Sequence, residues 1–371
     1  MPTVFSSKKA IVIGVVVFIL LLMQIETFAD QGWELKTQLS TERIVFATAV
    51  VGNKIYLIGG TLFENVKPGK AVRGPYGISI VEMYDTQTNT WQRVADMPTP
   101  RHGAKAAVVN GTIFVFGGWN GKDEGFANRK YPVNVEAYNP QTDTWIEKKE
   151  MPVSRVEFDI GVVDGKIYII GGAIRRDGGG ERIGRVDVYN PATDTWVEGR
   201  EMPTPRSSLG VGAVGNRIYA IGGRGWPPVR IGPHLTVIEE YDSRSHHWRK
   251  RGDMLDTRDS FATVVVTDSI YLIGGVILAG GPHEYLASVN VYDPQKDAWD
   301  EIPAMPIPLV PNGAATVNGK IYVFGGSTDV GKGVELLSDV TVYDTGFRAV
   351  AANGKLSTSW GKLKSEHQNQ P

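Results

Sequence analysis

The chain has 371 residues, 44 of them glycine and none cysteine, and its formal net charge at pH 7 is −1. A charge so close to zero excludes a bulk electrostatic attraction to nucleic acid or to an anionic membrane surface. The lack of cysteine excludes disulfides, thiol nucleophiles and thiolate metal sites, so an ordered fold must be stabilised by its core alone.

The first thirty residues have the pattern of a signal peptide. Lys8 and Lys9 precede an apolar run over residues 10–23, and the small residue Ala29 stands at a cleavage position. The run has 14 residues, fewer than the ~20 that a membrane-spanning helix needs. We therefore expect residues 1–29 to be removed during export to the periplasm or the cell exterior. An uncleaved anchor formed by residues 10–23 is the alternative, and it is the only membrane contact that we expect.

One sequence unit recurs six times after this segment. Each copy starts at a lead residue, continues through two β-rich runs, and reaches a Gly-Gly pair whose first glycine lies 16 positions after the lead residue. The Gly-Gly pairs follow one another at intervals of 51 to 58 residues. A regular period of this length indicates an array of structural repeats. The lead residues are Arg43, Arg101, Arg155, Arg206, Arg258 and Leu309.

The copy that begins at Arg155 shows what one unit builds. Asp164 and Gly165 separate two β-rich runs, which is typical of a hairpin with a two-residue turn. After a variable segment, two further β-rich runs with Tyr189 and Trp196 flank an Asn-Pro turn. Each unit therefore predicts four antiparallel strands. The same tyrosine-to-tryptophan spacing recurs in four other units, as Tyr84/Trp91, Tyr138/Trp145, Tyr241/Trp248 and Tyr292/Trp299.

Six such units predict an all-β fold, a six-bladed β-propeller with the tryptophans packed between neighbouring blades. The sixth unit has Val350 where its tryptophan would stand, whereas Trp33 lies ten residues before Arg43, as Trp91 does before Arg101. We therefore expect an N-terminal strand at Trp33 to complete the last blade and close the ring. Trp360 is the competing candidate. The expected propeller covers residues 30–345, and residues 346–371 form a C-terminal tail that we expect to be partly disordered.

The Gly-Gly pairs, the tyrosines, the tryptophans and their spacings resemble kelch repeats over essentially all of the mature chain, as in a secreted bacterial kelch-repeat protein. The resemblance implies a kelch β-propeller. More distantly, it extends to the central domain of galactose oxidase, to the periplasmic sialic acid mutarotases and to the substrate-binding end of ubiquitin-ligase adaptors. Such a fold alone says little about function. Copper chemistry of the galactose oxidase type is excluded because it needs a cysteine, and we expect no cofactor and no metal site.

The strand order places the lead residues and the long variable loops on one face of the propeller. Five lead residues are arginines, whose forked donors suit carboxylates and phosphates, although a purely structural role within the blades is the alternative. The loops of the first four units carry a summed charge of about +7 and several aromatic residues. The expected ligand contacts are Arg43, Arg101, Arg155, Arg206, Arg258, Arg73, Tyr76, Trp119, Arg129, Arg175, Arg224 and Trp226. Leu309 marks the side of the ring where we expect no ligand.

These features predict a monomeric, non-enzymatic interaction propeller that binds an anionic glycan or an acidic protein segment and does not bind nucleic acid. The alternative is a carbohydrate enzyme such as a sugar-acid mutarotase or epimerase. In that alternative Glu157 or Asp259, at the channel mouth beside an arginine, acts as a general base. The simpler account of both carboxylates is that each pairs with a neighbouring arginine.

Overall fold

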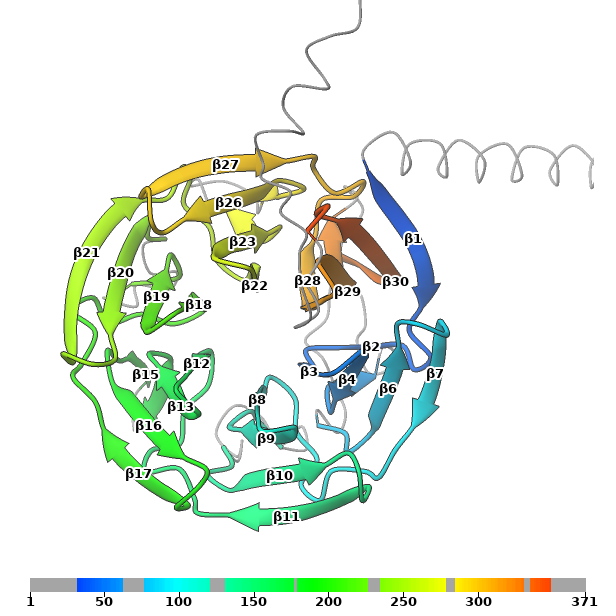
Figure 1. The fold of residues 1–371 in the computed structure, drawn as a ribbon, viewed down its shortest axis with the longest axis horizontal. Coiled ribbons are helices and arrows are strands. Elements are labelled where there is room, and N and C mark those ends of the chain that lie inside the picture. The colour runs from blue at the N-terminus through cyan, green and yellow to red at the C-terminus, as the bar shows by residue number, and fades with distance from the viewer. Residues whose placement is uncertain are drawn as a thin grey trace, which may run out of the picture.

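The computed structural model describes residues 32–62, 77–120, 131–176, 179–225, 234–277, 284–329 and 334–347. Within these ranges there are six four-stranded antiparallel sheets, and they are arranged in a ring around a central axis (Figure 1). The predicted six-bladed β-propeller is therefore confirmed. None of the described residues belongs to a helix long and apolar enough to span a membrane.

The blades follow one another in chain order, with the strands of each named here from the channel outward. Blade I has β3 (Ala47–Val51), β4 (Lys54–Ile58), β6 (Val81–Asp85) and β7 (Thr90–Arg93). Blade II has β8 (Lys105–Val109), β9 (Thr112–Phe116), β10 (Val135–Asn139) and β11 (Thr144–Lys148). Blade III has β12 (Asp159–Val163), β13 (Lys166–Ile170), β16 (Val186–Asn190) and β17 (Thr195–Glu198).

Blades IV to VI continue the same order. Blade IV has β18 (Gly210–Val214), β19 (Arg217–Ile221), β20 (Val237–Asp242) and β21 (His247–Asp253). Blade V has β22 (Ala262–Val266), β23 (Ser269–Ile273), β26 (Val289–Asp293) and β27 (Ala298–Ile302). Blade VI has β28 (Val310–Val317), β29 (Lys320–Asp329), β30 (Val334–Asp344) and β1 (Trp33–Gln38).

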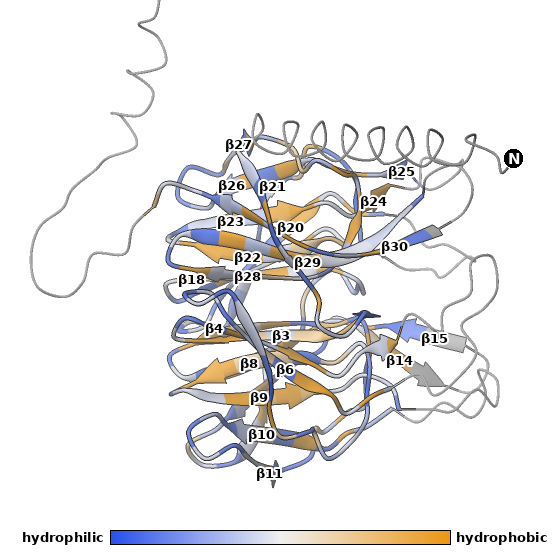
Figure 2. Cartoon of the chain, turned by 90° about the vertical axis from the view of Figure 1, so that its right-hand side faces the viewer, coloured by the Kyte–Doolittle hydropathy of each residue, from blue (hydrophilic) through white to orange (hydrophobic). Residues whose placement is uncertain are grey.

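One face of the ring, here called the loop face, carries the lead residues and the segments between the second and third strands. Three short two-stranded pairs lie on it: β2 (Arg43–Ile44) with β5 (Thr61–Leu62), β14 (Ala173–Arg176) with β15 (Gly179–Arg182), and β24 (Val276–Ile277) with β25 (Glu284–Tyr285). Figure 2 shows β14, β15, β24 and β25 projecting at one side of the ring. The opposite face carries the tight hairpins.

The N-terminal strand closes the ring, as the tryptophan spacing predicts. β1 pairs with β30, with Trp33 opposite Tyr343, so the last blade takes its outer strand from the start of the described chain (Figure 1). Trp33 is fully buried, and its ring centroid lies 5.3 Å from that of Tyr343. Because β1 pairs with β30, that edge of β30 is not left exposed at the seam. The competing candidate, Trp360, lies outside the described residues.

The core lies between adjacent blades. The second strand of each blade is buried on both faces, so its sequence shows little alternation of polar and apolar residues. Examples are KIYLI of β4 and KIYII of β13. Ile55 and Leu57 of blade I pack with Tyr322 and Phe324 of blade VI in one apolar cluster. Because each cluster is shared by two neighbours, no blade buries its apolar faces alone.

Blade tryptophans also bond to the preceding blade. The Nε1–H of Trp145 donates to the carbonyl oxygen of Ala95, at 2.9 Å, in the segment that leaves blade I. Trp91, in blade I, is the exception: its Nε1 is buried and has no hydrogen-bond partner among the residues that the structure describes. The same interblade bond links Trp33 to Pro303, Trp196 to Lys149, Trp248 to Arg200 and Trp299 to Asp253.

Candidate functional site

The five lead arginines are internal to their blades. None is more than 1% exposed. Arg101 is representative: its Nη2 donates to Oε2 of Glu136 at 2.8 Å, and its Nη1 donates to the carbonyls of Gly117 and Asn134 at 3.1 and 3.2 Å. Thr99 completes the network by donating its hydroxyl to the other oxygen of Glu136. The guanidinium group is therefore occupied within blade II.

Each of the other four arginines has an equivalent partner on the third strand of its blade, two residues before the blade tyrosine. Arg43 pairs with Glu82 at 3.1 Å and Arg206 with Glu239 at 2.9 Å. Arg155 pairs with Asp187, and Arg258 bonds to Asn290 and to Asp256.

These contacts correct the prediction that the lead arginines meet a ligand. Burial lowers the pKa of Arg43 to about 10, although the charge of Glu82 opposes the shift. Burial likewise lowers the pKa of Arg155 to about 9. A group that is costly to bury and already paired with a buried carboxylate is part of the scaffold. The structural alternative is the one that the geometry supports for all five.

The central channel is a polar cavity of about 310 Å³ to which all six blades contribute the starts of their inner strands. Lys105 at the start of β8 and Asp159 at the start of β12 face one another, with 3.0 Å between Nζ and Oδ1. Asp159 also accepts the backbone N–H of Val211 at 2.9 Å. The Lys105 side chain is 44% exposed and that of Asp159 is 17% exposed, so the cation is the more accessible partner.

Two adjoining groups of polar side chains lie on the loop face of blades III to V, just before the inner strands begin. Backbone hydrogen bonds between Ser207 and Arg224 join the two groups, and together we call them the rim cluster. Arg182 donates to the hydroxyl of Ser207 at 3.2 Å and to the carbonyl of Gly225 at 3.0 Å. Ser207 in turn donates to Glu157 at 2.8 Å. The cluster consists of Glu157, Arg182, Ser207, Ser208, Arg224, Asp259 and Ser260.

Asp259 anchors one end of the rim cluster. It is fully buried, and the Arg224 guanidinium donates to its two oxygens at 2.5 and 3.0 Å. Ser260 donates to Oδ1 at 2.5 Å, and Nε2 of His234 lies 3.1 Å from Oδ2. Burial lowers the pKa of Arg224, but its bond to Asp259 outweighs this, so the net shift is upward. Both oxygens of Asp259 are thus engaged by neighbouring side chains of the rim cluster.

Glu157, the other carboxylate considered as a general base, is exposed. Its Oε2 accepts hydrogen bonds from Ser207 at 2.8 Å and from Ser208 at 3.3 Å. It reaches solvent but has no arginine within ion-pair distance in the described part of the chain.

Aromatic side chains stand on the loop face of blade II, at the described ends of its long loop. The ring centroid of Trp119 lies 5.0 Å from that of His102 and 5.9 Å from that of Tyr131. Trp119 and Tyr131 are half-buried, so each presents part of its ring on the loop face. The role of Trp119 as a ligand contact stays a prediction.

Most of the remaining residues that we predicted to contact a ligand lie outside the part of the chain that the structure describes. Arg224 lies in the rim cluster. Arg175 lies on β14, and its side chain is outside the described residues. Arg73, Tyr76, Arg129 and Trp226 also lie outside the described residues. Sequence reasoning missed Arg182, Lys105 and the third-strand partners of the lead arginines. A signal for those partners was present, because the residue two positions before the blade tyrosine is acidic or Asn wherever the lead residue is Arg.

Comparison with known proteins agrees with this architecture. Residues 45–275 match the KLHDC2/KLHL20/DRC7 Kelch-repeats domain. The chain belongs to the kelch-repeat family. The rest of this kelch propeller matches two further copies of the Kelch motif, at residues 257–306 and 308–349.

The kelch propeller also resembles several characterised chains. It is 28% identical over 295 residues to Kelch-like protein terF of Aspergillus terreus, which covers 77% of this chain and 61% of that protein. It is 25% identical to Kelch-like protein 35 of Mus musculus, covering 76% of this chain and 44% of the relative. Beta-scruin of Limulus polyphemus is 27% identical, with 77% and 30% covered. The chain thus spans less than two thirds of each of these relatives.

A solved structure titled "Structure of YjhT" superimposes on the kelch propeller with a TM-score of 0.68. The alignment covers 86% of this chain and all of the other at 18% sequence identity. Similarity at this level of identity shows a shared fold alone.

Proposed function

We propose that this kelch propeller is an exported, non-enzymatic interaction protein that binds an anionic glycan or an acidic protein segment on its loop face. The kelch-like relatives favour an interaction role. The observation that carries the proposal is the exposure of cationic side chains on this side of the ring: Arg182 and Arg224 in the rim cluster, and Lys105 in the channel.

In two of the ion pairs on this side of the ring, the cationic side chain is more exposed than its carboxylate partner. The side chains of Lys105 and Arg224 are 44% and 27% exposed, whereas their partners Asp159 and Asp259 are 17% and 0% exposed. Arg182 is also half-buried, and its guanidinium group donates hydrogen bonds to a hydroxyl and to a backbone carbonyl, which are both neutral. An incoming carboxylate or sulfate can replace these neutral acceptors and gain a charge-assisted bond.

The surrounding residues support the same class of ligand. The loops of blades I to IV carry a sequence charge of about +7, which attracts an anionic partner over roughly a Debye length of 8–10 Å. Trp119 and Tyr131 offer ring surface for a sugar or for an apolar side chain of a peptide. Asp259 is the candidate general base of the mutarotase or epimerase alternative, and both of its oxygens already accept hydrogen bonds from neighbouring side chains. This favours the binding role over that alternative.

Binding to arrays of acidic glycans and acidic peptides tests the proposal. We expect Arg182→Ala and Lys105→Ala each to weaken binding by about tenfold, the loss of one charge-assisted contact. Arg93→Ala is the matched control, because Arg93 is 52% exposed on outer strand β7 and its ion pair is with Asp96, away from the loop face. Binding that Arg93→Ala reduces as much as Arg182→Ala would contradict the assignment to the loop face.

Export is tested separately, by sequencing the N-terminus of the chain recovered from outside the cytoplasm. We expect it to begin at Asp30. A recovered chain that still begins at Met1 would contradict cleavage and favour the anchor over residues 10–23.

A further inference from the structure

Blade VI departs from the other blades at three positions that contact one another elsewhere. In blades I, II and IV a threonine two residues before the lead arginine bonds to the third-strand glutamate, as Thr99 does to Glu136. Blade VI has Ile307 in place of that threonine and Leu309 in place of the arginine. Thr341 stands in place of the glutamate. The whole polar network is therefore replaced by a mostly apolar set.

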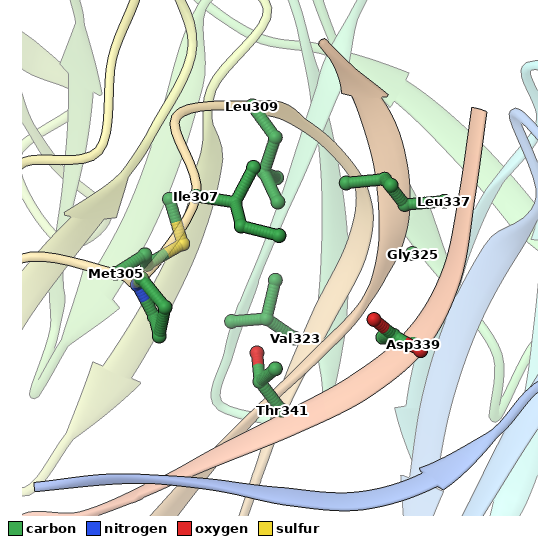
Figure 3. A pocket seen from close by; sticks show the side chains of 9 residues that line it. Met305, Ile307, Leu309, Val323, Gly325, Leu337, Asp339 and Thr341 are labelled. Carbon is green, nitrogen blue, oxygen red and sulfur yellow. The ribbon is translucent and has the colours of Figure 1, made fainter. Parts of the chain in front are cut away.

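The replacement leaves a small cavity, here called the blade VI notch (Figure 3). Its volume is about 20 Å³, enough for one methyl-sized or water-sized group. The side chains of Ile307, Leu309, Val323 and Leu337 point toward it in Figure 3, with Asp339 and Thr341 at its edge. An apolar cavity of this kind favours the tip of an aliphatic side chain over water.

Asp339 gives the notch an acidic edge. Its Oδ1 accepts a hydrogen bond from Nε2 of Gln38 at 3.2 Å. In the ranges that the structure describes, no lysine or arginine pairs with it. An occupant that places an aliphatic side chain in the notch would therefore gain an ion pair if a basic residue flanked that side chain.

The chain itself contains such a segment. We propose that the blade VI notch is the docking site for residues 360–364 of this chain, which read Trp-Gly-Lys-Leu-Lys. One methyl group of the Leu363 side chain enters the notch, and Lys362 or Lys364 pairs with Asp339. This inference does not depend on the proposed function of the loop face.

The length of the tail permits this contact. The last described residue, Phe347, lies against Gly319 at the hairpin end of blade VI. From Gly319 to the notch residue Gly325 the chain rises six residues along β29, or about 20 Å. The 16 residues from Phe347 to Leu363 span up to about 50 Å when extended. The segment can therefore reach the notch without strain.

The tail also offers a matched control. Leu356 lies in a similar sequence, Gly-Lys-Leu-Ser, with one neighbouring lysine instead of two. It is within reach of the notch as well, but it offers less charge to Asp339. If charge complementarity selects the occupant, Leu363 is selected over Leu356.

Amide hydrogen exchange of the full chain, read by mass spectrometry over residues 361–365, tests the docking. We expect these amides to exchange roughly tenfold more slowly in the natural sequence than in Leu363→Asp, which corresponds to a tenfold docking equilibrium. Thr341→Ile, which fills the notch, should give the same release, whereas Leu356→Asp should leave the protection unchanged.

Two results would overturn the proposal. One is equal exchange in the natural chain and in Leu363→Asp, a variant that leaves the propeller itself unaltered. The other is release of protection by Leu356→Asp and not by Leu363→Asp, which would assign the notch to a different segment.

Discussion

A buried arginine stabilises a fold only where neighbouring groups satisfy its charge and its donors. In blades I to IV the partner is a carboxylate two residues before the blade tyrosine, as Glu136 is before Tyr138. In blade V that position is Asn290, and Asp256 supplies the carboxylate. Where the arginine is lost, at Leu309, the acidic partner is lost too, and Thr341 takes its place. The pair is therefore a unit of the scaffold, and the repetition that suggested a ligand-binding ring is repetition of this unit.

The blade tyrosines predict a pH effect at the residue scale. Burial raises the pKa of Tyr84 to about 12, above the value of about 10 expected in the unfolded chain. The stability that the neutral hydroxyl contributes is thus fully present below pH 10 and is lost as the pH rises toward 12. Tyr84 also donates to Asn89 at 2.6 Å.

Chemical denaturation of Tyr84→Phe at several pH values measures this effect. At pH 8 we expect the variant to be less stable by about 1 kcal/mol, because the hydrogen bond is missing. Between pH 10 and 12 the natural chain should lose about 1–2 kcal/mol relative to the variant. A constant difference over that range would show that Tyr84 does not titrate with the shifted pKa.

At the scale of the elements, blades II, III and V are each joined to the preceding blade by the same set of hydrogen bonds, here called the clasp. Asp143 follows Tyr138 by five residues, has a positive φ of 54°, and accepts both the tyrosine hydroxyl and the backbone N–H of Ala95. Trp145 donates to the carbonyl of the same Ala95. Asp194 makes the same pair of contacts, with Tyr189 and Lys149.

The clasp predicts different costs for two equivalent substitutions. Trp145→Phe removes a hydrogen bond across the interface and should lower the free energy of unfolding by about 1 kcal/mol beyond the loss of packing. Trp91→Phe removes an indole N–H that has no partner within the described part of the chain, so it should cost distinctly less. Urea denaturation of both variants gives the comparison, and equal losses would contradict the role assigned to the bond.

The sequence predicts the elements well where they repeat and poorly where they do not. The strand positions and the closing role of Trp33 follow from the fixed spacings between residues that recur in each repeat, such as the spacing of Trp91 before Arg101. The sequence does not predict whether the lead arginines point into the blade or toward a ligand, because a guanidinium group suits a buried glutamate and a ligand equally well. The contact of Arg182 with Ser207 is specific to blades III and IV, so no pattern that repeats along the sequence predicts it.

At the scale of the whole molecule, stability depends on closure, because each apolar cluster is shared by two blades. Trp33→Ala removes a fully buried ring from the seam and should cost about 3–5 kcal/mol. Leu35→Ala on the same strand is the control, since Leu35 is 44% exposed and should change stability by less than about 1 kcal/mol. Similar midpoints of thermal unfolding for the two variants would contradict the closing role of β1.

We propose a division of roles, in which the lead arginines belong to the scaffold and the rim cluster binds the ligand. A parallel measurement of thermal unfolding and of binding to the acidic arrays, for Arg101→Ala and Arg182→Ala, tests it most directly. Arg101→Ala leaves Glu136 buried without its cation and should lose about 3–5 kcal/mol of stability. Arg182→Ala should keep the unfolding midpoint and lose binding. An Arg101→Ala variant that keeps its stability and loses binding would contradict the account.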